Sequence, residues 1–156
     1  MIYFYGHSGN KAYKEFSNFH PSKFTYFDLP FKTGEHALHW RKAMLFEDYK
    51  TAKAILEAKT PSQAKKLGRQ VRKFKEDAWA NERFDYMVDI LEAKFSNPLI
   101  KKVLMDTGAT SIFEAAPKDR VWGIGLSVTD AESGKAHRGA NLLGRALVEA
   151  RGRMSV

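Results

Sequence analysis

Four residues of this chain carry side chains suited to chemistry at a bond between a sugar and a base. Glu35 and Asp119 are carboxylates, and Trp79 and Trp122 are indoles, spread over most of the 156 residues. One carboxylate can stabilise an oxocarbenium ion or activate water, and a second can protonate a leaving nitrogen. Indole faces can stack on a flat base. We therefore treat these four residues as one candidate site.

Each of these residues also has an ordinary explanation. The helix dipole favours an acid such as Glu35 near a helix start, and tryptophans such as Trp79 and Trp122 are most often core residues. Asp119 could be an ordinary turn residue that is solvated or paired with neighbouring Arg120. However, Trp122 precedes Gly123-Ile124-Gly125, and glycine permits the close backbone approach that suits a ligand wall.

A cluster of cations and one asparagine are candidates for binding the rest of a substrate. Arg69 follows Gly68 and matches phosphate by bidentate donation, although a solvated helix face would look the same. Asn141 can either cap the last helix or offer its amide to a ligand at that helix's positive end. The neighbouring cations are Lys65, Lys66, Arg72 and Lys73.

The sequence gives little support for a metal site. His36 and His39 lie three residues apart, but Ala37 occupies the place where the metalloprotease pattern requires glutamate. The chain has no cysteine, which excludes disulfides and thiolate sites. We therefore expect neither a metal nor a cofactor.

Composition indicates an ordinary soluble domain. The hydrophobic content is 44% and the charged content 28%, and 156 residues is a common size for one domain, here residues 1–156. No secretory leader and no apolar run of ~18 residues is visible, so we expect a cytoplasmic protein that does not enter the membrane. The net charge of +8 favours anionic partners, either a phosphorylated metabolite or nucleic acid.

The elements that must position these residues are mainly helices. Residues 2–5, 23–27, 31–32, 111–115 and 121–126 are expected to be strands, with a turn at residues 28–30. Residues 6–22 read as an ordered loop and residues 128–139 as a mobile one. The last helix should include residues 142–150. The other expected helices begin at cap residues Thr33, Asp48, Thr60, Asp77 and Asn97. The pattern predicts a single α+β domain, mostly helical, with a small β-sheet.

An ordered set of short motifs covers nearly the whole chain. They are residues 15–19 (EFSNF), 34–36 (GEH), 64–69 (AKKLGR), 77–83 with Trp79, 93–95 (AKF), 116–125 (APKDRVWGIG) and 139–144 (GANLLG). Taken together and in this order, they resemble the NADAR superfamily, which includes the YbiA-like N-glycosidases. The resemblance implies a NADAR-like α+β domain.

The resemblance also implies hydrolysis of an N-glycosidic bond. YbiA-like members release ribose 5-phosphate from amino-pyrimidine intermediates of the riboflavin pathway, and other members act on ADP-ribose attached to a base, including guanine in nucleic acid. By matching motif, the catalytic residues would be Glu35, Trp79 and Asp119. The substrate-binding residues would be Asn18, Arg69, Trp122, Gly123 and Asn141.

Several alternatives stay open at this point. Glu35 is assigned to stabilising the cation and activating water, and Asp119 to protonating the leaving nitrogen, but the reverse assignment is nearly as good. The protein could instead remove ADP-ribose from nucleic-acid bases, or bind ADP-ribose or a nucleotide without cleaving it. A basic helical adaptor would show both Trp79 and Trp122 fully buried.

Overall fold

The computed structural model describes residues 1–155. Its strands are β1 (Ile2–Phe4), β2 (Phe24–Tyr26), β3 (Leu29–Phe31) and β4 (Ile112–Glu114). Its helices are the 3-10 helix η1 (Lys14–Phe16), α1 (Gly34–Leu45), α2 (Tyr49–Glu57), α3 (Pro61–Gly68), α4 (Glu76–Lys94), α5 (Pro98–Met105), α6 (Val128–Glu132) and α7 (Leu142–Met154).

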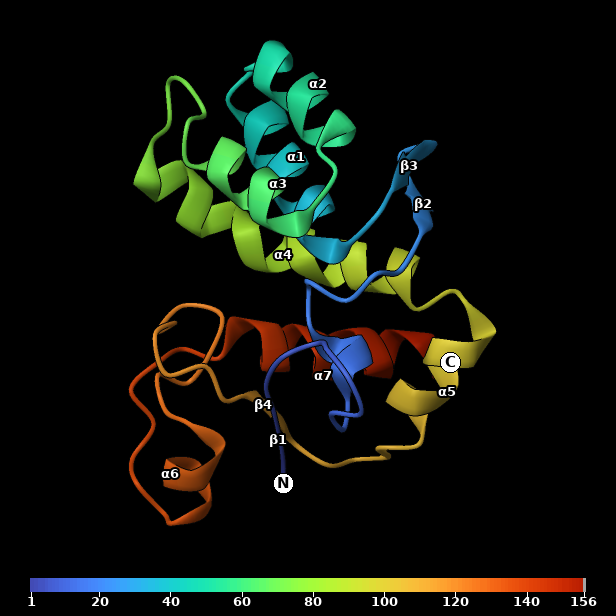
Figure 1. The fold of residues 1–156 in the computed structure, drawn as a ribbon, viewed down its shortest axis with the longest axis vertical. Coiled ribbons are helices and arrows are strands. Elements are labelled where there is room, and N and C mark those ends of the chain that lie inside the picture. The colour runs from blue at the N-terminus through green and yellow to red at the C-terminus, as the bar shows by residue number, and fades with distance from the viewer. Residues whose placement is uncertain (156) are drawn as a thin grey trace.

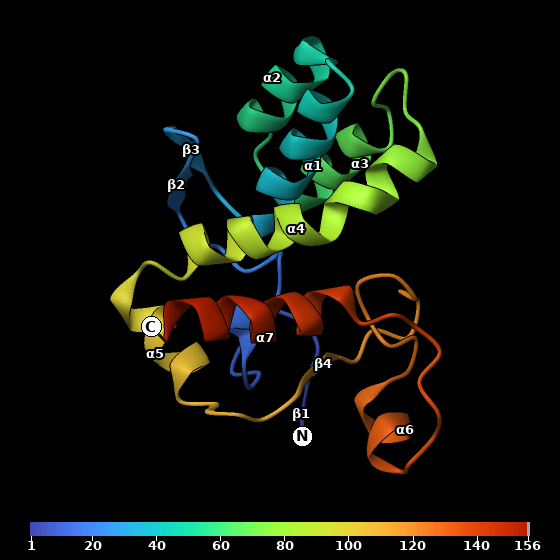
Figure 2. The same cartoon turned by 180° about the vertical axis from the view of Figure 1, so that it is seen from behind.

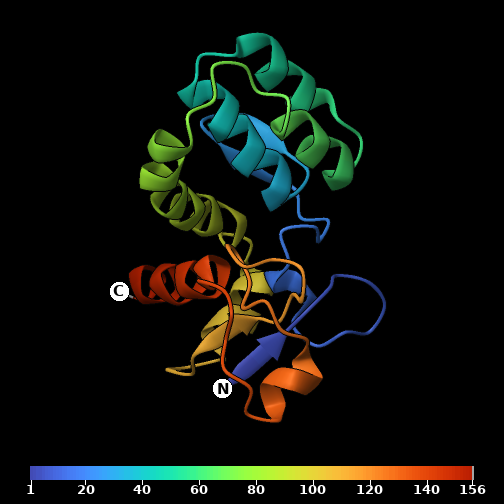
Figure 3. The same cartoon turned by 90° about the vertical axis from the view of Figure 1, so that its left-hand side faces the viewer.

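Helix α4 lies in the middle of the fold. Helices α1, α2 and α3 pack together on one side of it, next to the β2–β3 hairpin, and α7 packs along the other side (Figures 1 and 2). Seen from the side, β1, β4 and α6 lie beyond α7, away from α1–α3 (Figure 3). The α+β prediction is confirmed, although the strands form two separate two-stranded sheets: parallel β1–β4 and antiparallel β2–β3.

Side-chain caps begin most of the predicted helices. The caps expected from the sequence accept a backbone N–H as predicted, which satisfies a donor that the helix leaves unpaired; they are Thr33, Asp48, Thr60 and Asn97. Asp77 was wrong as a cap. Helix α4 begins at Glu76 after Lys75, which makes no side-chain cap bond, so Asp77 lies inside the first turn. The helix dipole favours an acid there as well.

The turn of the β2–β3 hairpin begins one residue earlier than the expected turn at residues 28–30. Phe27 and Asp28 have φ angles of 51° and 59°, the left-handed pair that a two-residue hairpin loop needs. Pro30 therefore lies within β3, opposite Thr25, and not in the turn. A two-stranded sheet has only edge strands, where proline is tolerated.

Residues 121–126 do not form the predicted strand. The carbonyls of Arg120, Gly123 and Ile124 accept N–H groups from Ala140, Asn141 and Arg138, and these pairs follow no single register. A Cβ at Gly139 would overlap the Gly123 carbonyl, so the two loop segments touch backbone to backbone. Residues 128–139, expected to be a mobile loop, are partly helical. They begin with α6, and the Ser127 side chain caps this helix.

Candidate functional site

Glu35 lies in the first turn of α1 and is only 8% exposed. Its Oε1 is 2.8 Å from Nε2 of His39, one turn further along the same helix. The His39 ring packs against Gly68 of α3, where any Cβ would overlap the ring. Glycine at position 68 therefore lets α3 approach α1 closely enough to cover this pair. His39 was singled out in the sequence only as a metal ligand.

Asp119 organises the turn that carries Trp122. Its Oδ1 accepts the backbone N–H groups of Val121 and Trp122, each at 2.9 Å. A Cβ on Gly123 would lie 3.0 Å from the backbone carbonyl oxygens of both Asp119 and Glu114. The absence of a side chain at Gly123 therefore lets the backbone of this loop pack closely against the end of β4.

Asn141 holds the end of β4 in place. Its Oδ1 accepts the N–H of Glu114, and its Nδ2 donates to the carbonyl of Ile112, both at 3.0 Å. Of the two roles considered from the sequence, the cap is not formed by the side chain: Asn141 stands at the N-cap position of α7 with a left-handed φ of 54°, but it makes no side-chain cap bond. Both polar atoms of the amide bond to the backbone of β4, so Asn141 positions that strand and not a substrate.

Glu114 is the residue around which the carboxylates gather. Its pKa is raised from 4.5 to about 8, first by burial and then by the nearby charges of Asp119 and Glu35, while Lys65 opposes the rise. Glu114 therefore lies within electrostatic reach of its near neighbour Asp119 and of Glu35, which comes from a distant part of the chain. Sequence analysis missed Glu114; its only signal was its place at a strand end, five residues before Asp119.

Asn18 adjoins the start of α1. Its backbone carbonyl accepts the N–H of Glu35 at 3.0 Å, and its buried Oδ1 touches Gly34 without a hydrogen-bond partner among residues 1–155. The preceding carbonyl, that of Ser17, accepts Nζ of fully buried Lys94 at 2.9 Å. Burial lowers the pKa of Lys94 to about 7. The buried Lys94 amine therefore holds the loop that brings Asn18 to Glu35.

Trp79 and Arg69 lie near Lys42, which is two turns along α1 from Glu35. Lys42 Nζ is 5.9 Å from the ring centroid of Trp79, and its pKa is lowered by burial and by the charge of Arg69. Lys42 follows Glu35 by seven residues, which is about 10 Å along a helix. Trp79 is 7% exposed, whereas Trp122 is only partly buried, so the two indoles are not both hidden as an adaptor would require.

His36 has a structural environment. Its Nδ1 is 2.7 Å from the Thr33 hydroxyl and its Nε2 is 2.9 Å from the Ala58 carbonyl, and burial lowers its pKa. Both ring nitrogens are therefore occupied. Over residues 1–155, no cluster of three or more His, Asp or Glu side chains is arranged to hold a metal ion. In the same residues, no helix is both long and apolar enough to cross a membrane.

Comparison with known proteins agrees with this architecture. Residues 3–155 match the NADAR domain family. An N-glycosidase of Acanthamoeba polyphaga mimivirus is 34% identical over 96% of this chain and 94% of that protein. A riboflavin biosynthesis protein of Vibrio vulnificus is 30% identical over 96% of this chain but only 37% of its own length.

A solved structure shows the same fold. The NMR structure of the Escherichia coli protein YbiA superposes with a TM-score of 0.78 at 24% identity, covering 99% of this chain and 85% of that chain. The enzyme class expected from the sequence, an N-glycosyl hydrolase, is confirmed by the N-glycosidase relative. With nearly its whole length matched, the chain belongs to the NADAR domain family.

Proposed function

We propose that this protein hydrolyses the bond between C1 of a phosphorylated or ADP-ribosylated ribose and the nitrogen of a base. The observation that carries the proposal is that Glu35 and Asp119 both act electrostatically on buried Glu114, whose backbone meets that of Asp119 at Gly123. The names of the relatives support it: one is an N-glycosidase, and a longer one is a riboflavin biosynthesis protein. Phosphoribosylamino-pyrimidine intermediates of the riboflavin pathway are therefore the first candidate substrates.

Glu114 is the group best suited to protonate the leaving nitrogen. A carboxyl with a pKa of about 8 is mostly protonated at neutral pH, as a general acid must be. After the transfer, Glu114 becomes a third negative charge beside Glu35 and Asp119. The positive charge that develops on the sugar at the same moment offsets that repulsion. This assignment replaces Asp119 as the proton donor.

Glu35 is the group we assign to the sugar cation. As the C–N bond breaks, positive charge grows on the anomeric carbon and ring oxygen, and a fixed carboxylate stabilises it more than it stabilises the ground state. His39 holds Oε1 of Glu35 in position at 2.8 Å. A water molecule then adds to the anomeric carbon and gives its proton to Glu35 or Asp119, which yields the free sugar.

Asp119 keeps an oxygen available for that water. Oδ1 is occupied by two backbone N–H groups, whereas Oδ2 accepts no hydrogen bond among residues 1–155. Trp79, Trp122, Arg69 and Asn18 stay candidates for holding the substrate. Gly123 and Asn141 would contribute indirectly, through the backbone of the loop and of β4.

A second candidate substrate is ADP-ribose on a base of DNA or RNA. The net charge of +8 favours it, because a polymer presents many phosphates. Salt separates the two candidates: each phosphate contact with a polymer steepens the loss of affinity with salt, whereas a small substrate gives a shallow dependence. A non-catalytic reader of ADP-ribose would bind such a ligand and release no base.

The deciding experiment is a chromatographic screen for a liberated base. The protein is incubated with the phosphoribosylamino-pyrimidines, NAD, ADP-ribose and ADP-ribosylated guanosine, next to the Glu35→Gln variant as a matched control. Base released by the wild type and not by the variant supports the proposal. If the wild type binds these compounds but releases no base from any, the protein is a reader and the proposal is wrong.

A further inference from the structure

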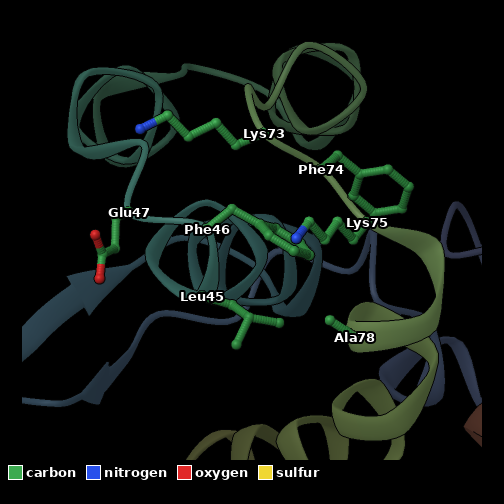
Figure 4. Close-up of a pocket in the computed structure, with 7 residues that line it drawn as sticks. All are labelled: Leu45, Phe46, Glu47, Lys73, Phe74, Lys75 and Ala78. Atoms are coloured by element: carbon green, nitrogen blue, oxygen red, sulfur yellow. The ribbon is translucent and has the colours of Figure 1, made fainter.

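A pocket of about 600 Å³ opens at the end of α1 that lies away from Glu35. One wall is the last residue of α1 with the two residues that follow it, and the other is the segment before α4 with Ala78 in the first turn of α4. Besides Ala78, the wall residues are Leu45, Phe46, Glu47, Lys73, Phe74 and Lys75. Figure 4 shows Phe46 at the end of α1 and Phe74 on the segment before α4, one on each wall. The proposed reaction uses none of these residues.

The pocket combines aromatic rings with cations. The Phe46 and Phe74 rings meet edge to face with centroids 5.3 Å apart, and Phe74 is 39% exposed. Lys73 and Lys75 are the cations of the lining, and Lys42, which lies just outside it, places its Nζ 4.5 Å from the centre of the Phe74 ring. Within residues 1–155 no carboxylate comes within 4.0 Å of that ammonium, although Glu76 acts on it from further away. Half-buried Lys42 is therefore available to an anion.

One buried carboxylate ties the two walls together. Asp48 accepts hydrogen bonds from the backbone N–H of Arg72 at 2.9 Å and from its guanidinium at 3.1 Å. The residues beside this link, Glu47 and Lys73, have left-handed φ angles of 57° and 61°, which are costly for residues with a Cβ. The Asp48–Arg72 link thus holds both strained residues, and the opening between them, in a fixed geometry.

The pocket lies in line with the carboxylates. Glu35, His39 and Lys42 follow one face of α1 at helical spacing, and Phe46 continues it. Eleven residues separate Glu35 from Phe46, which is about 16 Å along a helix. That distance exceeds the reach of a ribose phosphate held at Glu35 and is suited to a substrate with a second nucleotide.

We propose that this pocket binds a purine nucleotide, with the base on the exposed part of Phe74 and the phosphate at Lys42. Stacking on an aromatic ring and pairing with an ammonium are the two interactions that such a ligand requires. The purine would be the distal base of an ADP-ribosyl substrate. The identification of the purine as part of an ADP-ribosyl substrate rests on the proposed function, whereas the binding of a purine nucleotide in the pocket does not.

The test is a calorimetric titration of the full-length protein with AMP. We expect saturable binding, at least a tenfold increase in Kd for Phe74→Ala, and a smaller increase for Lys42→Gln, which removes the charge that pairs with the phosphate. The matched controls are Phe27→Ala, which removes an exposed ring from the β2–β3 turn, and Lys53→Gln, which removes an exposed charge on α2. Both controls should bind AMP as the wild type does, and all variants should keep the wild-type circular dichroism spectrum.

The results separate this inference from the proposed function. AMP binding that Phe74→Ala weakens, in a protein that releases no base, supports the pocket and rejects the hydrolase. Hydrolysis of a phosphoribosylamino-pyrimidine by a protein that does not bind AMP overturns the pocket and keeps the hydrolase. Unchanged AMP affinity in both Phe74→Ala and Lys42→Gln also overturns the pocket, because the nucleotide would then bind elsewhere.

Discussion

His39 Nε2 lies 2.8 Å from Glu35 Oε1, and only about a tenth of either side chain is exposed. The two residues lie on consecutive turns of α1, so the helix itself sets their separation. The carboxylate is therefore held by an element of regular structure and not by a loop, which is the arrangement that a pre-organised charge in a site requires.

The first prediction concerns the charge on Glu35. Glu35→Gln keeps the shape and the contact with His39 but removes the negative charge that the sugar cation needs. We expect kcat to fall by roughly 10²–10⁴-fold, the range typical of a catalytic carboxylate. The melting temperature should change little. The exposed Glu57→Gln is the matched control, and near-wild-type turnover of Glu35→Gln would remove this residue from the mechanism.

The second prediction concerns Asp119. In Asp119→Asn, Oδ1 can still accept the N–H groups of Val121 and Trp122, so the turn should persist. The lost charge no longer raises the pKa of Glu114, which lies at about 8 in the wild type. We therefore expect the alkaline limb of the kcat profile to move to lower pH. A limb that stays in place would show that Asp119 and the titrating acid do not interact.

The third prediction concerns Glu114 and has two parts. Turnover should decline as pH rises through about 8, because the acid then loses its proton. Glu114→Gln should lower kcat strongly and abolish this decline, since glutamine donates no acidic proton. Glu114→Asp, which keeps the carboxyl group, should retain a decline with pH. A wild-type profile that is flat between pH 6 and 10 would contradict the assignment.

Glu114→Gln should raise the stability of the protein although it lowers kcat. The folded-state pKa of Glu114 is raised from 4.5 to about 8, so below pH 4.5 the group is protonated in both states and costs nothing. Above pH 4.5 the unfolded state ionises first, and the destabilisation is complete above about 8, at roughly 1.4 kcal/mol per pKa unit. Urea unfolding should find Glu114→Gln stabilised relative to the wild type at pH 8, and much less so at pH 4.5.

Local signals in the sequence explain how much of the fold was predictable. Thr33, Asp48, Thr60 and Asn97 each bond to a donor two or three residues away, so the helix starts could be read directly. Glu35 was recoverable for the same reason, since it follows its cap. Residues 121–126 have the composition of a strand, but their partners lie in residues 138–143 and follow no register. Composition does not reveal such pairing.

The candidate site was only partly predictable for a related reason. The raised pKa of Glu114 depends on burial and on charges 5 and 79 residues away in the chain, and nothing in its neighbourhood distinguishes it from an ordinary strand-end acid. Asn141 shows the reverse case. Its type and place indicated a helix cap, yet its left-handed backbone turns the amide toward β4. Tertiary contacts decided both outcomes.

The fourth prediction concerns Asn141. Asn141→Ala leaves the N–H of Glu114 and the carbonyl of Ile112 without their partners. Unsatisfied buried groups cost about 1–3 kcal/mol each, so we expect a loss of at least that size in urea unfolding. Asn81→Ala, at an exposed position of α4, is the control and should unfold as the wild type does. Equal stability of the two variants would show that water replaces the amide.

The fifth prediction concerns the fully buried Lys94, whose ammonium donates to the Ser17 carbonyl. Its pKa is lowered from 10.5 to about 7, chiefly by burial, while Glu15 partly opposes the shift. Below pH 7 both folded and unfolded states carry the charge, and the folded state bears the full cost of burying it. Between pH 7 and 10.5 the folded state sheds the proton first, so this cost disappears as pH rises.

The stability of the wild type should therefore increase relative to Lys94→Met as pH rises from 7 to 10. Methionine has no titrating group, and its flexible chain can fill the same space. Urea unfolding of both proteins at pH 6, 8 and 10 measures the difference directly, with exposed Lys53→Met as the control for general effects of charge removal. A constant difference across this range would mean that Lys94 keeps its proton, and that the loop carrying Asn18 is held by a permanent cation.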